Sequence, residues 1–152
     1  MVSFDETLQQ LQNLHTGSQL MDAEDAIKIT ANRGFIVPEG FNTTIAFEGD
    51  VNSQIIKFEC PKYWEGHDLS KCDYIKLLWI NTGNNFEGET ELKILADNED
   101  NIILGWLVPP EVFAKKGEIE LSISIYDLDE NNRIAFAWNT SVLKQLQIGT
   151  SI

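Results

Sequence analysis

Three oxygen-bearing side chains at alternate positions could bind a calcium ion. Asp127, Asp129 and Asn131 lie in "DLDENN", the order of residues that opens a calcium-binding loop. Such a loop also needs a glycine at its sixth position and, at its twelfth, a glutamate that binds through both oxygens. These positions hold Asn132 and Trp138, so two required residues are missing and we predict no metal site.

The same segment is better explained as a hairpin turn, because Asp and Asn tolerate left-handed backbone and bond their own amides. It lies within "IELSISIYDLDENNRIAFAWNT", residues 119–140, and resembles the earlier stretch "TELKILADNEDNIILGW", residues 90–106. Each stretch has an alternating run, a break rich in Asp and Asn, a second apolar run and a tryptophan near its end. We interpret the repeat as one hairpin design used twice.

A second candidate site is the aromatic loop "CPKYWEGHDLS". Tyr63, Trp64 and His67 could form a ligand platform on which a sugar stacks, or a hot spot for a protein partner. The alternative is that these rings fold back onto the edge of the core, since aromatic side chains carry a large apolar surface. The composition of the loop favours the second interpretation.

Other catalytic and metal-binding patterns are missing from the sequence. No serine is flanked by glycines in a nucleophile motif, and the two histidines, His15 and His67, have no motif around them. The spacing of Cys60 and Cys72 fits no metal-ligand pattern. We expect both to be reduced, half-buried thiols, with a disulfide as the alternative. The sequence predicts neither an enzyme nor a cofactor.

Composition limits the classes of partner. The 152 residues are enough for one domain with a real core, and 11 basic against 24 acidic residues give a formal charge of −13. Such a chain would be repelled by a phosphate backbone, so nucleic-acid binding is not expected. No apolar run is long enough to cross a bilayer, and the amino terminus lacks the features of a signal peptide. We expect a soluble protein made in a cytoplasm.

The amino-terminal segment has helical periodicity. Ser3 and Glu6 form a capping box, and Gly17 provides a stop signal. Four apolar side chains fall on one face of the predicted helix: Phe4, Leu8, Leu11 and Leu14. Because so short a helix is marginal alone in water, this face must pack on the chain's own sandwich or on a neighbouring subunit. The sequence leaves both possibilities open.

From about Ile27 onward the pattern is that of short strands bounded by Gly, Pro, Asn or Asp. In the run 118–127, alternate residues are apolar and predict one buried face: Ile119, Leu121, Ile123 and Ile125. Three tryptophans late in strands are predicted to lie in the core: Trp79, Trp106 and Trp138. A single helical turn between Pro110 and Gly117 is expected to bridge two hairpins. The predicted architecture is an all-β antiparallel sandwich over residues 27–152, preceded by a helical arm and linker over residues 1–26.

The order of several motifs resembles the amino-terminal domain of baseplate upper proteins and related virion proteins of tailed phages that infect Gram-positive bacteria. The likeness covers about residues 27–148 and includes "NRGFIVP", "FECPKYWEGHDL", "WLVPP" and "AFAWNT". The matching residues are Arg33, Pro38, Phe58, Pro61, Asp68, Leu69, Trp106, Val108, Pro109, Gly117, Trp138, Asn139 and Thr140.

This resemblance implies an immunoglobulin-like β-sandwich that serves as a structural building block of a virion, with no catalytic residues. Two departures bear on its role. Family members usually continue into a long carboxy-terminal region that trimerises or carries receptor-binding parts, whereas this sequence ends at Ile152. The predicted amino-terminal helix also lies outside the shared pattern. These departures favour an adaptor or decoration subunit over a complete baseplate arm.

The sequence therefore predicts a virion structural protein, synthesised in the host bacterial cytoplasm and assembled in several copies with other virion proteins. The predicted contact residues are Phe4, Leu8, Leu11 and Leu14. The alternative is a carbohydrate-binding module that recognises a glycan of the host cell wall through Tyr63, Trp64 and His67. Neither hypothesis involves a membrane or a nucleic acid.

Overall fold

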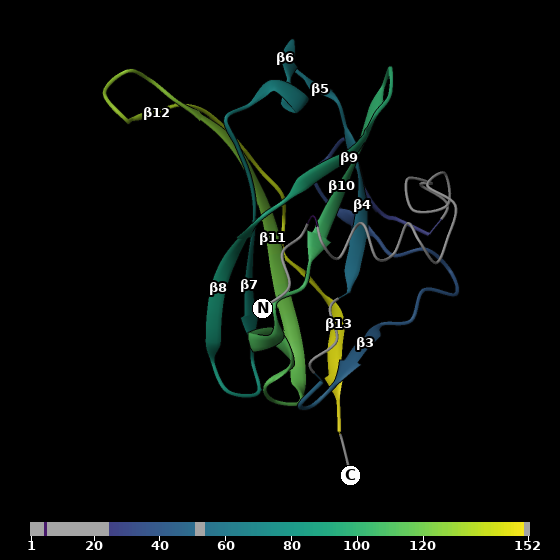
Figure 1. The fold of residues 1–152 in the computed structure, drawn as a ribbon. Coiled ribbons are helices and arrows are strands. Elements are labelled where there is room, and N and C mark those ends of the chain that lie inside the picture. The colour runs from purple at the N-terminus through teal and green to yellow at the C-terminus, as the bar shows by residue number, and fades with distance from the viewer. Residues whose placement is uncertain (1–4, 6–24, 51–53, 151–152) are drawn as a thin grey trace.

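The computed structural model describes residue 5 and residues 25–50 and 54–150 (Figure 1). The predicted amino-terminal helix, with Phe4, Leu8, Leu11 and Leu14, lies outside these residues, so the structure does not test it. The described chain is all-β, apart from two short 3-10 turns, η1 (Leu69–Lys71) and η2 (Pro110–Phe113).

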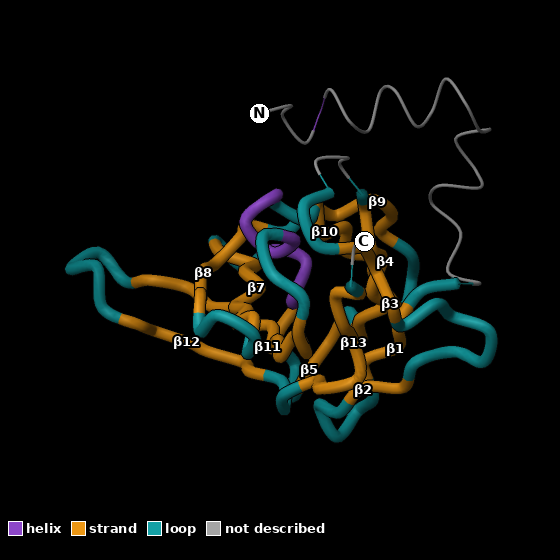
Figure 2. Tube along the Cα trace, turned by 90° about the horizontal axis from the view of Figure 1, so that it is seen from below, coloured by secondary structure: helices purple, strands orange, loops and turns teal. Residues whose placement is uncertain are grey.

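Two sheets form a sandwich (Figures 1 and 2). The five-stranded sheet has the order β2 (Phe35–Ile36), β1 (Ile27–Ile29), β4 (Ile55–Pro61), β10 (Asn101–Leu107), β9 (Lys93–Asp97). The six-stranded sheet has the order β3 (Thr44–Phe47), β13 (Leu143–Gly149), β11 (Gly117–Leu128), β7 (Tyr74–Asn81), β8 (Phe86–Glu91), and β12 (Ile134–Asn139) also pairs with β11. A separate small hairpin consists of β5 (Tyr63–Trp64) and β6 (His67–Asp68).

The predicted β-sandwich is confirmed, although its pairing is not antiparallel throughout. Within the described chain, β1 pairs in parallel with β4, and β3 pairs in parallel with β13, while the other pairs are antiparallel. In each parallel pair, a short strand from the first part of the chain joins a strand that lies much later in the sequence: β4 follows β1 by more than 20 residues, and β13 lies near the end of the described chain. Local turn chemistry does not specify such pairs.

The predicted core is confirmed. Ile119, Leu121, Ile123 and Ile125 are at most 1% exposed, because β11 alternates between the interior and the outer surface. The three tryptophans are also buried, with exposures of 5% for Trp79, 0% for Trp106 and 1% for Trp138. Side chains of both sheets belong to one continuous apolar cluster, so the sandwich has a single core.

Both predicted hairpins are present, and they lie in different sheets. In the five-stranded sheet β9 pairs with β10, and in the six-stranded sheet β11 pairs with β12. In the second turn, the Asp129 carboxylate accepts hydrogen bonds from the amides of Asn131 (2.8 Å) and Arg133 (3.0 Å), and Asn132 has a φ of 60°. Asp129 therefore acts as a turn residue that binds its own backbone.

The structure corrects one predicted strand. The alternating run of the earlier stretch, residues 90–97, predicts a single strand, but it is divided between β8 and β9, which belong to different sheets. Leu92 lies at the crossing, is 4% exposed, and donates its amide to the carbonyl of Ile75 at 2.8 Å. Burial of this side chain turns the strand from one sheet into the other, which a continuous apolar pattern does not reveal.

Candidate functional site

The aromatic segment expected to be a loop is instead a tight hairpin. Trp64 pairs with His67 and Tyr63 pairs with Asp68, leaving Glu65 and Gly66 in the turn with φ values of 47° and 82°. Two positive φ values in a two-residue turn are typical of type I′ hairpins. Because neighbouring residues of a strand point to opposite faces, Trp64 and His67 share one face and Tyr63 lies on the other. The three candidate residues therefore do not form one platform.

Trp64 packs against the core, as the alternative interpretation expected. Its ring lies 6.4 Å from the ring of Phe136 on β12, and the Arg33 guanidinium carbon is 5.6 Å from its centroid. The His67 ring stacks on Phe136 with centroids 3.9 Å apart and an interplanar angle of 21°. His67 is exposed, but its stacking on Phe136 covers one face of its ring, and together these contacts join the small hairpin to the sandwich.

Tyr63 lies on the opposite face of the hairpin from Trp64 and His67 and is 54% exposed. The neighbouring Lys62 ammonium lies 5.8 Å from its ring centroid and 2.7 Å from the Asp97 carboxylate. The hydrogen bond to Asp97 raises the pKa of Lys62. A single exposed ring with a cation beside it can stack on one planar or apolar group.

Asp68, next to His67, has a structural role. Its carboxylate accepts a hydrogen bond from the Ser70 amide at 3.0 Å and another from the Ser70 hydroxyl, so it caps η1. These hydrogen bonds lower the pKa of Asp68. Leu69 follows it and is fully buried, which anchors the hairpin to the core.

Both cysteines are free thiols. Cys60 is fully buried rather than half-buried as predicted, while Cys72 is half-buried. Burial raises the pKa of Cys60 to about 12. Burial, followed by the charge of Asp127, raises the pKa of Cys72 to about 11. Neither environment activates a thiolate nucleophile.

The acidic residues of the calcium-like pattern are engaged in backbone contacts. The Asp127 carboxylate accepts the Asp73 amide at 2.7 Å, and the Asp73 carboxylate accepts the Leu128 amide at 3.4 Å. This reciprocal pair ties the start of β7 to the end of β11. Within residues 25–50 and 54–150, no group of three or more His, Cys, Asp or Glu side chains could hold a metal ion.

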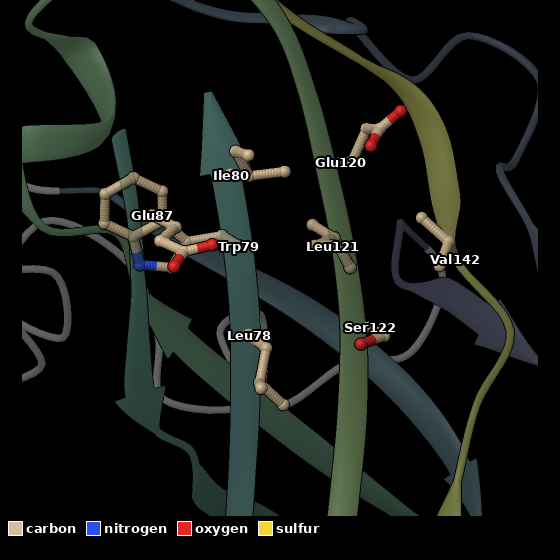
Figure 3. A pocket seen from close by; sticks show the side chains of 8 residues that line it. All are labelled: Leu78, Trp79, Ile80, Glu87, Glu120, Leu121, Ser122 and Val142. Atoms are coloured by element: carbon tan, nitrogen blue, oxygen red, sulfur yellow. The ribbon is translucent and has the colours of Figure 1, made fainter. Parts of the chain in front are cut away.

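A second candidate surface, which the sequence did not single out, lies on the outer face of the six-stranded sheet. A shallow hollow of about 180 Å³ has Leu78 and Ile80 of β7 on one side and Ser122 of β11 with Val142 on the other (Figure 3). Leu78 is 42% and Val142 is 52% exposed. An alternating strand pattern marks these positions only as outward-facing, so the sequence cannot distinguish such an apolar patch from ordinary surface.

An aromatic pair lies further along the same two strands, on the same face of the sheet. Tyr74 and Tyr126, directly opposite each other on β7 and β11, stack with ring centroids 5.0 Å apart. The Lys76 ammonium lies 5.1 Å and 5.7 Å from the two rings and 3.3 Å from the Glu89 carboxylate. We call the surface formed by the outward side chains of β7, β8 and β11, together with Val142, the outer face.

Comparison with protein-family models, with curated proteins and with solved structures found no match. The described residues include no helix long and apolar enough to cross a membrane.

Proposed function

We propose that this chain is a structural protein of a tailed bacteriophage virion, acting by protein–protein assembly as a baseplate, adaptor or decoration subunit. The observation that carries the proposal is the structural role of the residues on which the family resemblance rests. A motif shared for catalysis would bring polar groups together in a cleft. A motif shared for architecture would fill the core and fix turns.

Most of the matching residues have architectural roles. Five of them are apolar side chains at most 1% exposed: Phe58, Leu69, Trp106, Val108 and Trp138. Asp68 and Pro109 begin the two 3-10 turns, and Arg33 lies against the Trp64 ring. Gly117 has a φ of 154° and lies so close to the Gly83 backbone that a Cβ atom would be 2.6 Å from its nitrogen.

We further infer that the sandwich is immunoglobulin-like. In that fold, strands B, E and D are neighbours in one sheet, while G, F, C and C′ are neighbours in the other. The order β4, β10, β9 matches the first set, and the order β13, β11, β7, β8 matches the second. The chain order of these strands agrees with the same assignment, which supports the family proposal.

The proposed mechanism of assembly is burial of the amino-terminal apolar stripe against a neighbouring virion protein. Phe4, Leu8, Leu11 and Leu14 supply this stripe. Each fully buried side chain would contribute roughly 1.5–3 kcal/mol before the cost of ordering is subtracted. The sandwich itself would provide flat faces for repeated contacts between subunits.

Deletion of residues 1–17 tests this mechanism. The shortened chain is expected to fold, with the β-sheet circular dichroism and cooperative unfolding of the sandwich retained, and to be lost from particles assembled in its presence. Replacement of Leu8 and Leu11 by Ser should give the same loss, while replacement of Gln9 and Gln12 by Ser provides a matched control on the polar side of the predicted helix. A folded deletion variant that enters particles as efficiently as the full chain would refute docking through this segment.

Binding of a host cell-wall glycan remains the alternative, and the exposure of Tyr63 favours it. The Tyr63 ring gives a small stacking surface, and Trp64 and His67, on the other face of the hairpin, are in contact with Phe136. Any glycan contact would therefore centre on Tyr63, and a glycan array probed with the Tyr63→Ala variant tests it.

A further inference from the structure

We propose that the outer face is a second docking surface, and that its partner is a protein segment carrying Lys or Arg beside apolar side chains. The inference goes beyond assembly through the amino-terminal segment, and it does not depend on the particle in which the chain resides. It rests on the side chains that the strand register brings together on this face.

The apolar part of the face has a defined position. Leu78 lies opposite Ser122, and Ile80 lies opposite Glu120, in the register of β7 with β11. Val142 reaches the same hollow from the segment that precedes β13 (Figure 3). Small or charged side chains therefore surround an exposed apolar centre, an arrangement in which a partner's apolar side chain would be shielded from water.

The rim of the hollow is acidic. On β8, Glu87 lies opposite Ile80 and Glu89 lies opposite Leu78, so both carboxylates belong to the outer face. On β11, Glu118 and Glu120 occupy alternate outward positions. Acidic groups thus approach the apolar centre from both neighbouring strands. A cationic partner would be attracted, and an anionic one repelled.

The lysines on this face pair with only two of these four carboxylates. Lys76 pairs with Glu89 at 3.3 Å, and Lys144 pairs with Glu120 at 3.7 Å. Glu87 and Glu118 are exposed and form no ion pair with any described residue. The Glu87 carboxylate, which lines the hollow, and the Glu118 carboxylate, one outward position beyond Glu120, therefore remain available to a partner's Lys or Arg.

Protection of a sheet edge does not explain the whole pattern. Glutamates on an edge strand such as β8 prevent pairing between copies. Glu118 and Glu120, however, lie on β11, which has β7 on one side and β13 on the other. Carboxylates in the middle of a sheet protect no edge, so their place beside an apolar hollow favours recognition of a cationic group.

The charge of the face also argues against the chain's own amino-terminal segment as the occupant. Residues 1–25 contain five acidic residues and neither Lys nor Arg. The apolar stripe of that segment would bring further negative charge to an acidic rim. We therefore assign the face to a different, cationic protein segment.

The test is an NMR titration of the full, isotope-labelled chain with a short synthetic peptide in which Lys and Leu alternate. Amide shifts are expected to concentrate on β7, β8 and β11, and a peptide in which Glu replaces Lys should cause none. Shifts spread over the whole acidic surface, or no shifts at saturating peptide, would overturn the proposal. This map needs no variant, so a folding failure cannot obscure it.

A pair of matched variants then tests the carboxylates. Glu87→Gln combined with Glu118→Gln is expected to weaken binding of the Lys–Leu peptide by about tenfold. The control, Glu99→Gln combined with Glu130→Gln, makes the same change in net charge at two exposed turns away from the face. Equal weakening in both double variants would show that only the overall charge matters, and would contradict a specific site.

Discussion

The hydroxyl oxygen of Thr140 accepts a hydrogen bond from the backbone amide of Ile123 at 2.8 Å, while the Ile123 carbonyl accepts the Thr140 amide at 2.9 Å. These two hydrogen bonds lie between the end of β12 and the start of β13, on the side of β11 with which both strands pair. Between β12 and β13, the Thr140 hydroxyl takes the place of the backbone carbonyl that would otherwise accept the Ile123 amide. Val142 can therefore protrude toward the hollow of the outer face without leaving the Ile123 amide unpaired.

Replacing Thr140 with Val should destabilise the fold, because the Ile123 amide would lose its acceptor. We expect a decrease in the free energy of unfolding of about 1–3 kcal/mol, measured by chemical denaturation. Thr140→Ser keeps the hydroxyl and should lose much less. If the Ser and Val variants are equally destabilised, the hydrogen bond is not the cause.

Asn81 connects the end of β7 to the segment around η2. It is fully buried, and its amide group donates to the carbonyls of Val112 (3.1 Å) and Lys115 (2.6 Å). Its oxygen accepts the Gly83 amide at 2.8 Å.

Replacement of Asn81 by Ala should therefore lower the free energy of unfolding by roughly 2–4 kcal/mol, since it leaves several backbone groups unpaired. Asn139→Ala, at an exposed position of β12, is the matched control and should change stability by less than about 0.5 kcal/mol. A similar cost at both positions would contradict the assigned role of Asn81. Denaturant titration of the two variants decides the question.

Truncation of Trp64 should lower the stability of the fold much more than truncation of Tyr63. Trp64→Ala removes packing against Phe136 and the core, so it should cost about 1–3 kcal/mol of stability because the ring is half-buried. Tyr63→Ala should change stability by less than about 0.5 kcal/mol. Thermal and chemical unfolding measure the difference, and a destabilised Tyr63 variant would contradict the geometry described for this hairpin.

Burial of the Cys60 thiol should make the free energy of unfolding depend on pH in the alkaline range. Cys60 ionises near its ordinary value of 9.0 when unfolded, but its pKa rises to about 12 in the folded chain. The unfolded state therefore releases a proton first, and stability falls as pH rises from about 9 toward 12. The Cys60→Ala variant should show a shallower loss over this range, measured as the free energy of unfolding against pH. Identical slopes would mean that Cys60 does not contribute.

Much of the fold follows from local patterns in the sequence. Ile119 to Ile125 alternate clearly, and the Asp- and Asn-rich turns after β9 and β11 use chemistry that needs no tertiary context. Strand boundaries that depend on tertiary packing were harder to predict. Leu92 divides a run that looks continuous, and only the arrangement of two sheets around its side chain explains the break.

The candidate sites show the same limit. Trp64 and His67 were recognisable as aromatic residues, but their contact with Phe136 joins segments far apart in the sequence. The Glu65–Gly66 turn could have indicated a hairpin, since Gly favours positive φ, yet the run is too short for alternation to be visible. The outer face depends on the register of β7, β8 and β11, which no single strand specifies.

The central claim is that this chain is built into a tailed phage particle. The most direct measurement is quantitative mass spectrometry of gradient-purified particles produced from the genome that encodes it. We expect the chain in the particle fraction, in several copies and at a fixed ratio to the tail proteins. Folded protein that accumulates in the lysate but is absent from intact particles would contradict it.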